Sequence, residues 1–294
     1  MGCGKRSGKG KEYDDYGKIS FEGEYLNGKR NGKGKEYCCG YELEFEGEYL
    51  NGKRNGHGKE FNLDGKVIFE GEYLNGKRSG KGKEYNYDGK LSFVGEYLNG
   101  ERNGHGKEFD YDDILVFEGE FLNDERNGYG KEFNYAGILL FEGKYKNGNK
   151  WKGEIKEYSK NILLFEGKYM NGERNGHAKE FDYEGKLIFE GEYLNGKKSR
   201  KGIEYYNNGK IKFEGEYNEG KRWNGIIYDA ENNKVYELKK GKGIVKEYDN
   251  KCRLIFEGEY LNGDKWNGNC YETDYPGRLI IKFRYLNGNV EYSF

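Results

Sequence analysis

A stretch of 24 residues decides the fold of this chain, and one copy of it, at residues 45–68, reads FEGEYLNGKRNGHGKEFNLDGKVI. The phenylalanine that opens the stretch recurs in eight successive steps of 24 residues, at Phe21, Phe45, Phe69, Phe93, Phe117, Phe141, Phe165, Phe189 and Phe213. Self-similarity at a fixed period indicates a repeat architecture, in which each unit packs only against its neighbours. We therefore expect a repeated surface to carry the function.

The composition is polar but rich in aromatic residues. Charged residues make up 35% of the chain, hydrophobic residues 34%, and the mean hydropathy is -1.13. These values alone would favour disorder, because little apolar area offsets the entropy of ordering. Aromatic residues, however, make up 17% and fall at fixed positions in nearly every unit, so they supply the buried area that a thin sheet needs.

The charge balance and the cysteines limit the classes of partner and compartment. Lys plus Arg is 51 and Asp plus Glu is 52, so the net charge of -1 implies no nucleic acid or other bulk polyanion as a partner. The longest apolar runs are about four residues, far short of the ~20 that cross a bilayer. The cysteines have no metal-ligand spacing and favour a reducing, cytoplasmic setting; they are Cys3, Cys38, Cys39, Cys252 and Cys270.

Within a unit, the pattern predicts two short strands and two turns. The run from Leu187 to Tyr193 alternates apolar residues with glutamates, which is typical of a half-buried strand. Forty-nine glycines, spread through every unit, would break any helix. Pairs such as Asn27-Gly28, Asn31-Gly32 and Asp64-Gly65 indicate tight turns, because these residues accept positive φ at low cost. The predicted fold is all-β: an elongated, single-layer antiparallel array of hairpins with no helices of note.

The sequence also predicts how the strands pair. If Gly28 to Asn31 forms the hairpin loop, Tyr25 lies opposite Gly34, where its ring can lie over bare backbone, and Glu24 lies opposite Lys35. A following turn centred on Asp-Gly places Lys35 opposite Glu46 of the next unit. Such a ladder of alternating charge specifies register more than it stabilises, since each exposed pair contributes only ~0.2–1 kcal/mol.

We expect one continuous array over residues 1–294, in three parts. Residues 1–20 form an N-terminal half unit, because GKRSGKGKEY at 4–13 matches the second half of the motif. Regular 24-residue units fill 21–217. Residues 218–294 hold irregular C-terminal units, in which the tyrosine of each FEGEY-like segment recurs at Tyr236, Tyr260 and Tyr285.

Residues 21–34, FEGEYLNGKRNGKG, resemble the MORN (membrane occupation and recognition nexus) repeat, and phased copies cover nearly the whole chain. The resemblance implies a ribbon of antiparallel β-hairpins that serves as a scaffold, as in junctophilin-like membrane-contact proteins, some phosphatidylinositol phosphate kinases and cytoskeletal components of protists. It implies no catalytic residues. The first aromatic residue is Phe rather than the usual Tyr, and the second is Tyr rather than Trp, which leaves the subfamily open.

Basic pairs recur at one position of the hairpin loop and are predicted to line one edge of the ribbon. Each Lys or Arg near an anionic bilayer contributes ~1 kcal/mol, so anionic phospholipid is a candidate ligand. An acidic protein partner, or simple solvation of charged loop tips, are the alternatives. The opposite edge collects aspartates such as Asp64 and Asp88. The basic residues are Lys29 and Arg30, Lys53 and Arg54, Lys77 and Arg78, Lys197 and Lys198, and Lys221 and Arg222.

The tryptophans share this loop. Trp151, Trp223 and Trp266 each stand as an additional residue where other units read Arg-Asn-Gly. An amphipathic ring at a loop tip suits a lipid interface or a protein hot spot. The alternative is that each ring folds back over a neighbouring aromatic residue.

The first residues resemble an acylation signal, with Gly2 as the site of myristoylation and Cys3 as the site of palmitoylation, although the sixth residue is Arg6 rather than Ser or Thr. Two lipid chains beside the basic residues Lys5 and Lys9 would hold the chain at a membrane.

Repetition argues against an enzyme, because an active site needs a unique constellation of perturbed groups. The sequence therefore predicts a non-catalytic scaffold without a cofactor or metal. It would be cytoplasmic, peripheral to a membrane, and would bind a protein partner through its repeated surface, with anionic phospholipid as a second ligand. Two alternatives remain open: a carbohydrate- or choline-binding repeat module, and a filament component that self-associates end to end through its terminal strands.

Overall fold

The computed structural model describes residues 6–38, 42–229, 231, 235–249, 253–273 and 278–292. These residues form 25 strands and no helix, which confirms the all-β prediction. The chain divides into two compact units, Met1–Asn149 and Lys150–Phe294, each of which is described by itself. Gly2 and Cys3 lie outside the described residues. A single array over 1–294 stays a prediction.

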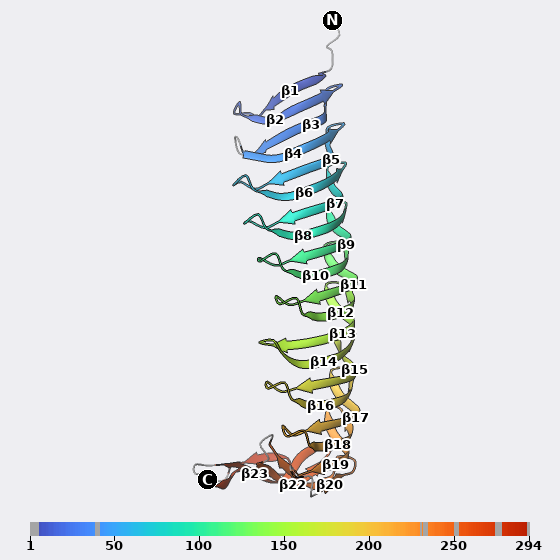
Figure 1. Ribbon diagram of the computed structural model, residues 1–294, viewed down its shortest axis with the longest axis vertical. Helices are drawn as coiled ribbons and strands as arrows, with labels where there is room; N and C mark the ends of the chain where they lie inside the picture. Colours follow the sequence, from blue (N-terminus) through green and yellow to red (C-terminus); the bar gives the residue numbers. More distant parts are fainter. Residues whose placement is uncertain are drawn as a thin grey trace. The chain divides into compact units, whose positions relative to one another are not determined.

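The first unit is a ribbon of antiparallel strands that pair in chain order (Figure 1). The strands are β1 (Gly8–Tyr13), β2 (Ile19–Leu26), β3 (Lys29–Cys38), β4 (Glu42–Leu50), β5 (Lys53–Phe61), β6 (Val67–Leu74), β7 (Lys77–Tyr85), β8 (Leu91–Leu98), β9 (Glu101–Phe109), β10 (Leu115–Leu122), β11 (Glu125–Phe133) and β12 (Leu139–Lys146).

The second unit continues the same hairpin pattern in two sheets. In the first sheet, β13 to β20 pair in chain order, and in the other, β21 to β25 do so. The strands are β13 (Asn149–Ser159), β14 (Ile162–Met170), β15 (Glu173–Phe181), β16 (Leu187–Leu194), β17 (Lys197–Tyr205), β18 (Ile211–Asn218), β19 (Lys221–Tyr228), β20 (Val235–Leu238), β21 (Gly243–Tyr248), β22 (Leu254–Leu261), β23 (Asp264–Thr273), β24 (Leu279–Leu286) and β25 (Asn289–Glu291).

The hairpin turn is the two-residue Asn-Gly pair. Asn27 has φ 52° and Gly28 has φ 82°, and the flanking Leu26 and Lys29 pair with each other. Positive φ at both central residues is what a type I′ turn requires, and Asn-Gly is the pair that adopts it most readily. The N–H of the turn glycine also donates to the previous hairpin, as Gly52 does to the carbonyl of Arg30 at 2.8 Å.

This turn changes the predicted register. Gly23 pairs with Gly34 and Tyr25 pairs with Arg30, so the prediction of Tyr25 opposite Gly34 and Glu24 opposite Lys35 is wrong. The second Asn-Gly pair, Asn31-Gly32, forms a bulge inside β3 and not a turn, and the bulge absorbs the difference.

The pairing between successive hairpins follows the prediction. Lys35 lies opposite Glu46, and Lys59 lies opposite Glu70 in the same way across the turn that contains Asp64-Gly65. The charge ladder therefore runs Glu22, Lys35, Glu46.

The core consists of phenylalanine rings laid over glycine. Phe45 is 0% exposed, and its centroid lies 5.7 Å from that of Tyr49 and 5.1 Å from that of Tyr73 in the next repeat, both edge to face. A Cβ atom on Gly58 would lie 2.3 Å from Cζ of Phe45, so only glycine leaves room for this ring position. The ring therefore packs over the backbone of the second strand of its own hairpin, and its contact with Tyr73 joins it to the next hairpin.

Arginine covers the other side of the Phe45 ring. The guanidinium carbon of Arg54 lies 4.1 Å from the centroid of Phe45, a cation–π contact. The same guanidinium pairs with Glu36 of the preceding repeat and, at 3.6 Å, with Glu60 of its own. Arg78 likewise bridges Glu60 and Glu84. A half-buried line of alternating charge therefore joins successive repeats on the core face.

Substituting Gly58 by Ala should destabilise the first unit by about 1–3 kcal/mol, because the added methyl group must displace Phe45. The loss should stop short of unfolding, since Ile155 and Ala178 stand at the equivalent position in the second unit. Urea unfolding of the full chain measures the effect. The control is His57→Ala, whose side chain is exposed on the opposite face. Equal stability of G58A and wild type would show that the ring is not held as described.

Candidate interaction surfaces

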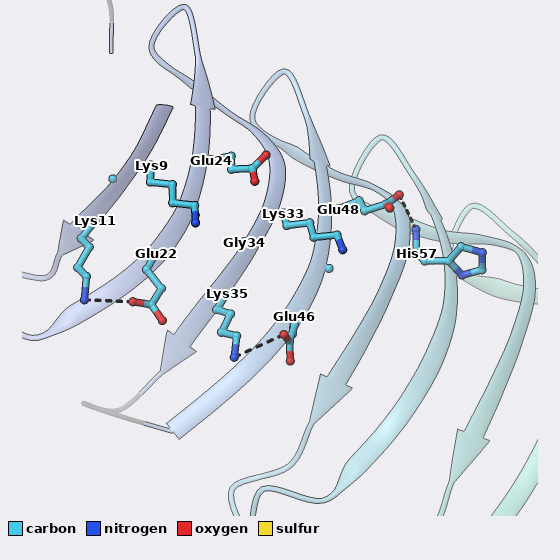
Figure 2. Close-up of a pocket in the computed structure, with 13 residues that line it drawn as sticks. Lys9, Lys11, Glu22, Glu24, Lys33, Gly34, Lys35, Glu46, Glu48 and His57 are labelled. Carbon is cyan, nitrogen blue, oxygen red and sulfur yellow. Dashed lines mark hydrogen bonds and ion pairs between the residues drawn. The ribbon is translucent and has the colours of Figure 1, made fainter. Parts of the chain in front are cut away.

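The face opposite the aromatic core carries glutamate and lysine above a floor of glycine. Because side chains alternate along a strand, Glu22 and Glu24 point away from the core that Phe21 and Tyr25 fill. Figure 2 shows these glutamates and the lysines of neighbouring strands on one side of the ribbon. They line a groove of about 750 Å³ whose floor includes the backbone of Gly34. We name this surface the charged groove.

The charged groove contains paired charges in register. Lys11 and Glu22 lie 3.1 Å apart, and Lys35 and Glu46 lie 3.4 Å apart, all four side chains remaining partly exposed (Figure 2). A second hollow of about 590 Å³ occupies the same face farther along the first unit, lined by residues from Lys81 to Glu142. The groove is therefore a repeated feature of the ribbon.

A tyrosine near the end of β3 holds the carboxylate of Glu22 in the charged groove. The hydroxyl of Tyr37 donates to Oε1 of Glu22 at 2.8 Å. Burial, followed by this hydrogen bond, raises the pKa of Tyr37 to about 12. The same hydrogen bond, and then Lys11, lower the pKa of Glu22, so this carboxylate remains ionised and presents a fixed negative charge.

The structure separates the members of each predicted basic pair. Lys29, Lys53 and Lys77 are exposed at the hairpin tips. Their partners Arg30, Arg54 and Arg78 turn inward and stack on the phenylalanine rings. Only the lysines are thus displayed to a ligand at the tips, and lipid contact by either set stays a prediction.

In the second unit, too, one member of a basic pair turns inward and the other is exposed. Lys198 lies 3.9 Å from the centroid of Phe189 and pairs with Glu180, while Lys197 is exposed and pairs with Glu219. Lys221 is also exposed.

An exposed leucine row at the hairpin tips was not singled out by the sequence analysis. Leu26, Leu50 and Leu74 are exposed, and each pairs directly with the exposed lysine of the same tip. The signal is present in the sequence, because a residue next to a buried tyrosine in a strand must point to the other face. We name these leucines and their lysines, Lys29, Lys53 and Lys77, the hairpin-tip row.

Seven copies of the MORN repeat match the sequence, at residues 21–41, 45–62, 69–90, 93–112, 117–133, 165–185 and 189–211. This chain is a MORN-repeat protein. The predicted resemblance is thereby confirmed. MORN repeats indicate an interaction or scaffold role built on the repeats, and the family is generally non-enzymatic.

Other comparisons add little. No curated protein matches the sequence. Among solved structures, the chains in "Crystal Structure of TcdB2-TccC3-Cdc42" and "Crystal Structure of TcdB2-TccC3-TEV" align at 10% and 9% identity over 92% and 95% of this chain, each with a TM-score of 0.21. This chain spans about a fifth of their length, 20% in both cases. Similarity at this level identifies neither a shared fold nor a shared function.

Two of the predicted tryptophans lie in shortened bulges of this MORN array. Tyr217 pairs with Arg222 and Glu216 with Asn224, so Trp223 is the single bulged residue. Trp266 occupies the same place in β23. In a regular repeat, the bulge is longer: residues 31–33 lie opposite the single residue Glu24. The interpretation of these two tryptophans as additional residues is therefore wrong, because their bulges are shorter.

The two rings fold back onto glycine rather than onto an aromatic residue. A Cβ on Gly241 would lie 2.9 Å from Cζ3 of Trp223, and one on Gly288 would lie 3.2 Å from Trp266. Trp151 is exposed, and its carbonyl accepts the N–H of Gly172 at 3.2 Å. Contact of the three tryptophans with lipid or a partner stays a prediction.

Arg222 joins the two sheets of the second unit. Its guanidinium pairs with Glu204 of β17 and, at 2.9 Å, with Glu247 of β21, and all three side chains are largely buried. Burial opposes ionisation of Glu204, but the charge of Arg222 and its hydrogen bonds outweigh burial and lower the pKa of Glu204 to about 2. The pKa of Glu247 is lowered for the same reason. This cluster is structural, since its charges are mutually satisfied.

Neither a metal-binding cluster nor a membrane-spanning helix is found among the described residues. Their His, Cys, Asp and Glu side chains form no group of three or more that could hold a metal ion. The described part of the chain also contains no helix with the length and apolar character needed to cross a membrane.

The ion pair between Glu204 and Arg222 should make stability pH-dependent. A carboxyl with a depressed folded-state pKa stabilises the fold above its unfolded pKa, and this contribution disappears as pH falls through the folded value. The difference in unfolding free energy between wild type and Glu204→Gln should therefore shrink between about pH 5 and about pH 2. Urea unfolding of both proteins measures it. A difference that stays constant over this range would contradict the assignment.

Proposed function

We propose that this MORN-repeat protein is a non-catalytic scaffold that binds a protein partner along the charged groove of its first unit. The observation that carries this proposal is the groove itself: partly exposed Glu and Lys of both signs, repeated in register above a floor of glycine backbone. Glycine allows a partner to approach the backbone closely. The fixed spacing of the repeats then offers the same contact several times.

Mixed charge favours a protein over other ligands. A groove that holds Lys35 next to Glu46, and Lys11 next to Glu22, presents no net field to attract a polyanion. A protein segment that carries acidic and basic residues in turn can pair with both signs. Each contact is weak at an exposed site, but successive contacts raise the effective concentration at the next repeat.

The test uses two variants with the same change in charge. The groove variant is Lys35→Ser, Lys59→Ser and Lys83→Ser, and the tip variant is Lys29→Ser, Lys53→Ser and Lys77→Ser. A partner captured with the intact chain and then purified should bind the groove variant about tenfold or more weakly, a loss of at least ~1.4 kcal/mol, by fluorescence anisotropy. It should bind the tip variant as it binds wild type. The opposite ranking would remove the groove as the binding surface.

The hairpin-tip row supports a second candidate function, peripheral association with anionic phospholipid at the cytoplasmic side of a membrane. Leu26, Leu50 and Leu74 can enter the interface between headgroups and acyl chains while the paired lysines contact the phosphates. Each lysine near an anionic surface contributes ~1 kcal/mol. The inward-facing arginines do not take part in this surface.

Co-sedimentation with vesicles tests the lipid candidate using the same two variants. Wild type and the groove variant should sediment with vesicles that contain phosphatidylserine and remain in solution with phosphatidylcholine alone. The tip variant should lose most of its binding, because about 3 kcal/mol of electrostatic attraction is removed. If all three proteins sediment equally, the hairpin-tip row is not a lipid-binding surface.

A further inference from the structure

The turns on the other edge of the first unit carry a row of exposed apolar side chains. Leu63, Tyr87, Tyr111 and Tyr135 are 66%, 82%, 79% and 65% exposed and occupy the same position in four successive turns. These turns follow β5, β7, β9 and β11 and lie on one side of the ribbon, at the left in Figure 1. We name the four residues the turn-tip row; it shares no residue with the charged groove or the hairpin-tip row.

The turn-tip row is rigidly built. In the turn of Tyr87, Oδ1 of Asn86 accepts the N–H groups of Asp88 and Lys90 at 2.9 and 3.0 Å. Neighbouring turns are also tied together, because Nζ of Lys66 donates to the carbonyl of Tyr87 at 2.9 Å, and Nζ of Lys90 donates to that of Tyr111 at 2.7 Å. The rings therefore stand on a fixed framework rather than on mobile loops.

The surroundings of the row are acidic. Asp64, Asp88 and Asp112 directly follow Leu63, Tyr87 and Tyr111 and are exposed. Lys66 and Lys90, which end two of these turns, donate to backbone carbonyls, and Lys90 also lies 3.7 Å from Asp112. Exposed carboxylates beside exposed rings disfavour an anionic membrane or nucleic acid and favour a ligand that is both apolar and basic.

The spacing of the row matches one peptide conformation. Successive turns are two strands apart, which is about 9.6 Å at ~4.8 Å per strand. A polyproline II helix repeats every three residues with a rise of ~3.1 Å, which gives about 9.3 Å per turn. Over the three steps from Leu63 to Tyr135 the two periods differ by only about 1 Å in total. A polyproline II segment can therefore present the same face to every member of the row.

We propose that the turn-tip row binds a proline-rich, basic segment of another protein in the polyproline II conformation, one helical turn for each repeat. Exposed aromatic side chains are the surface that proline-rich segments recognise, and the preformed conformation keeps the entropy cost of binding low. Prolines pack between successive rings, and arginine or lysine at every third position pairs with the aspartates. This surface is separate from the charged groove, so the inference stands independently of the proposed function.

The experiment measures binding of a fluorescein-labelled peptide of four Pro-Pro-Arg triplets to the full chain by fluorescence anisotropy. Wild type should bind it, and Tyr87→Ser, Tyr111→Ser and Tyr135→Ser together should weaken binding about tenfold or more. Asp88→Asn with Asp112→Asn should also weaken binding and reduce its dependence on salt. Because these side chains are exposed, the far-UV circular dichroism and thermal midpoint of the variants should match those of wild type.

The matched control is Tyr183→Ser. Tyr183 is exposed at the same position of a turn in the second unit, but Asn207 stands at that position in the next turn, and the preceding turn has Lys160 and Asn161. This variant should bind the peptide as wild type does. Equal binding by the triple variant, equal affinity for a peptide of Gly-Ser-Arg triplets, or no binding of the Pro-Pro-Arg peptide would overturn the proposal. Tyrosine-dependent binding of chitohexaose in place of the peptide would also overturn it and would indicate a glycan-binding row.

Discussion

The contact between a phenylalanine ring and bare backbone holds this structure together. Phe45 occupies the space where the side chain of Gly58 would be, touches the tyrosines of two repeats, and lies beneath the guanidinium of Arg54. A single layer of strands has no second layer against which to bury apolar side chains. In the first unit, five rings are instead buried between a glycine of their own hairpin and an arginine, so the core is built locally and repeated; they are Phe21, Phe45, Phe69, Phe93 and Phe117.

This arrangement also decides what the remaining surfaces can do. Once Phe, Tyr, Arg and one Glu of each repeat are committed to the core face, the charges left on the other face are the Glu and Lys of the charged groove. The two edges differ because the hairpin turns after β2, β4 and β6 are Asn-Gly flanked by leucine and lysine, whereas the opposite turns after β7 and β9 carry tyrosine and aspartate. The repeat therefore generates three different outward surfaces, and each recurs over several successive repeats of the first unit.

Much of the fold could be predicted from the sequence, because a period of 24 residues and the alternation around Phe and Tyr determine strands, turns and the pairing of Lys35 with Glu46. The pairing of the two strands inside a hairpin could not be predicted. Asn27-Gly28 and Asn31-Gly32 give the same turn signal, and only the structure shows that the second is a bulge. The two-residue turn pairs Arg30 directly with the buried Tyr25, which explains why Arg30 turns toward Phe21, although the sequence placed it on an exposed loop beside Lys29. The outward direction of the tip leucines could be predicted from alternation, whereas the exposure of the turn tyrosines could not, because turn residues do not alternate between faces.

Neighbouring hairpins meet through the same bonds at every step of the first unit, including the N–H of Gly52 on the carbonyl of Arg30 and that of Gly76 on Arg54. Each junction is therefore interchangeable with the next. If residues 69–92 were removed, Tyr97 would meet Phe45 where Tyr73 does, and no hairpin would be left without its neighbour. Genetic recombination can therefore add or remove whole repeats without changing the packing of the core. The length of such an array can change in evolution while its contacts stay the same.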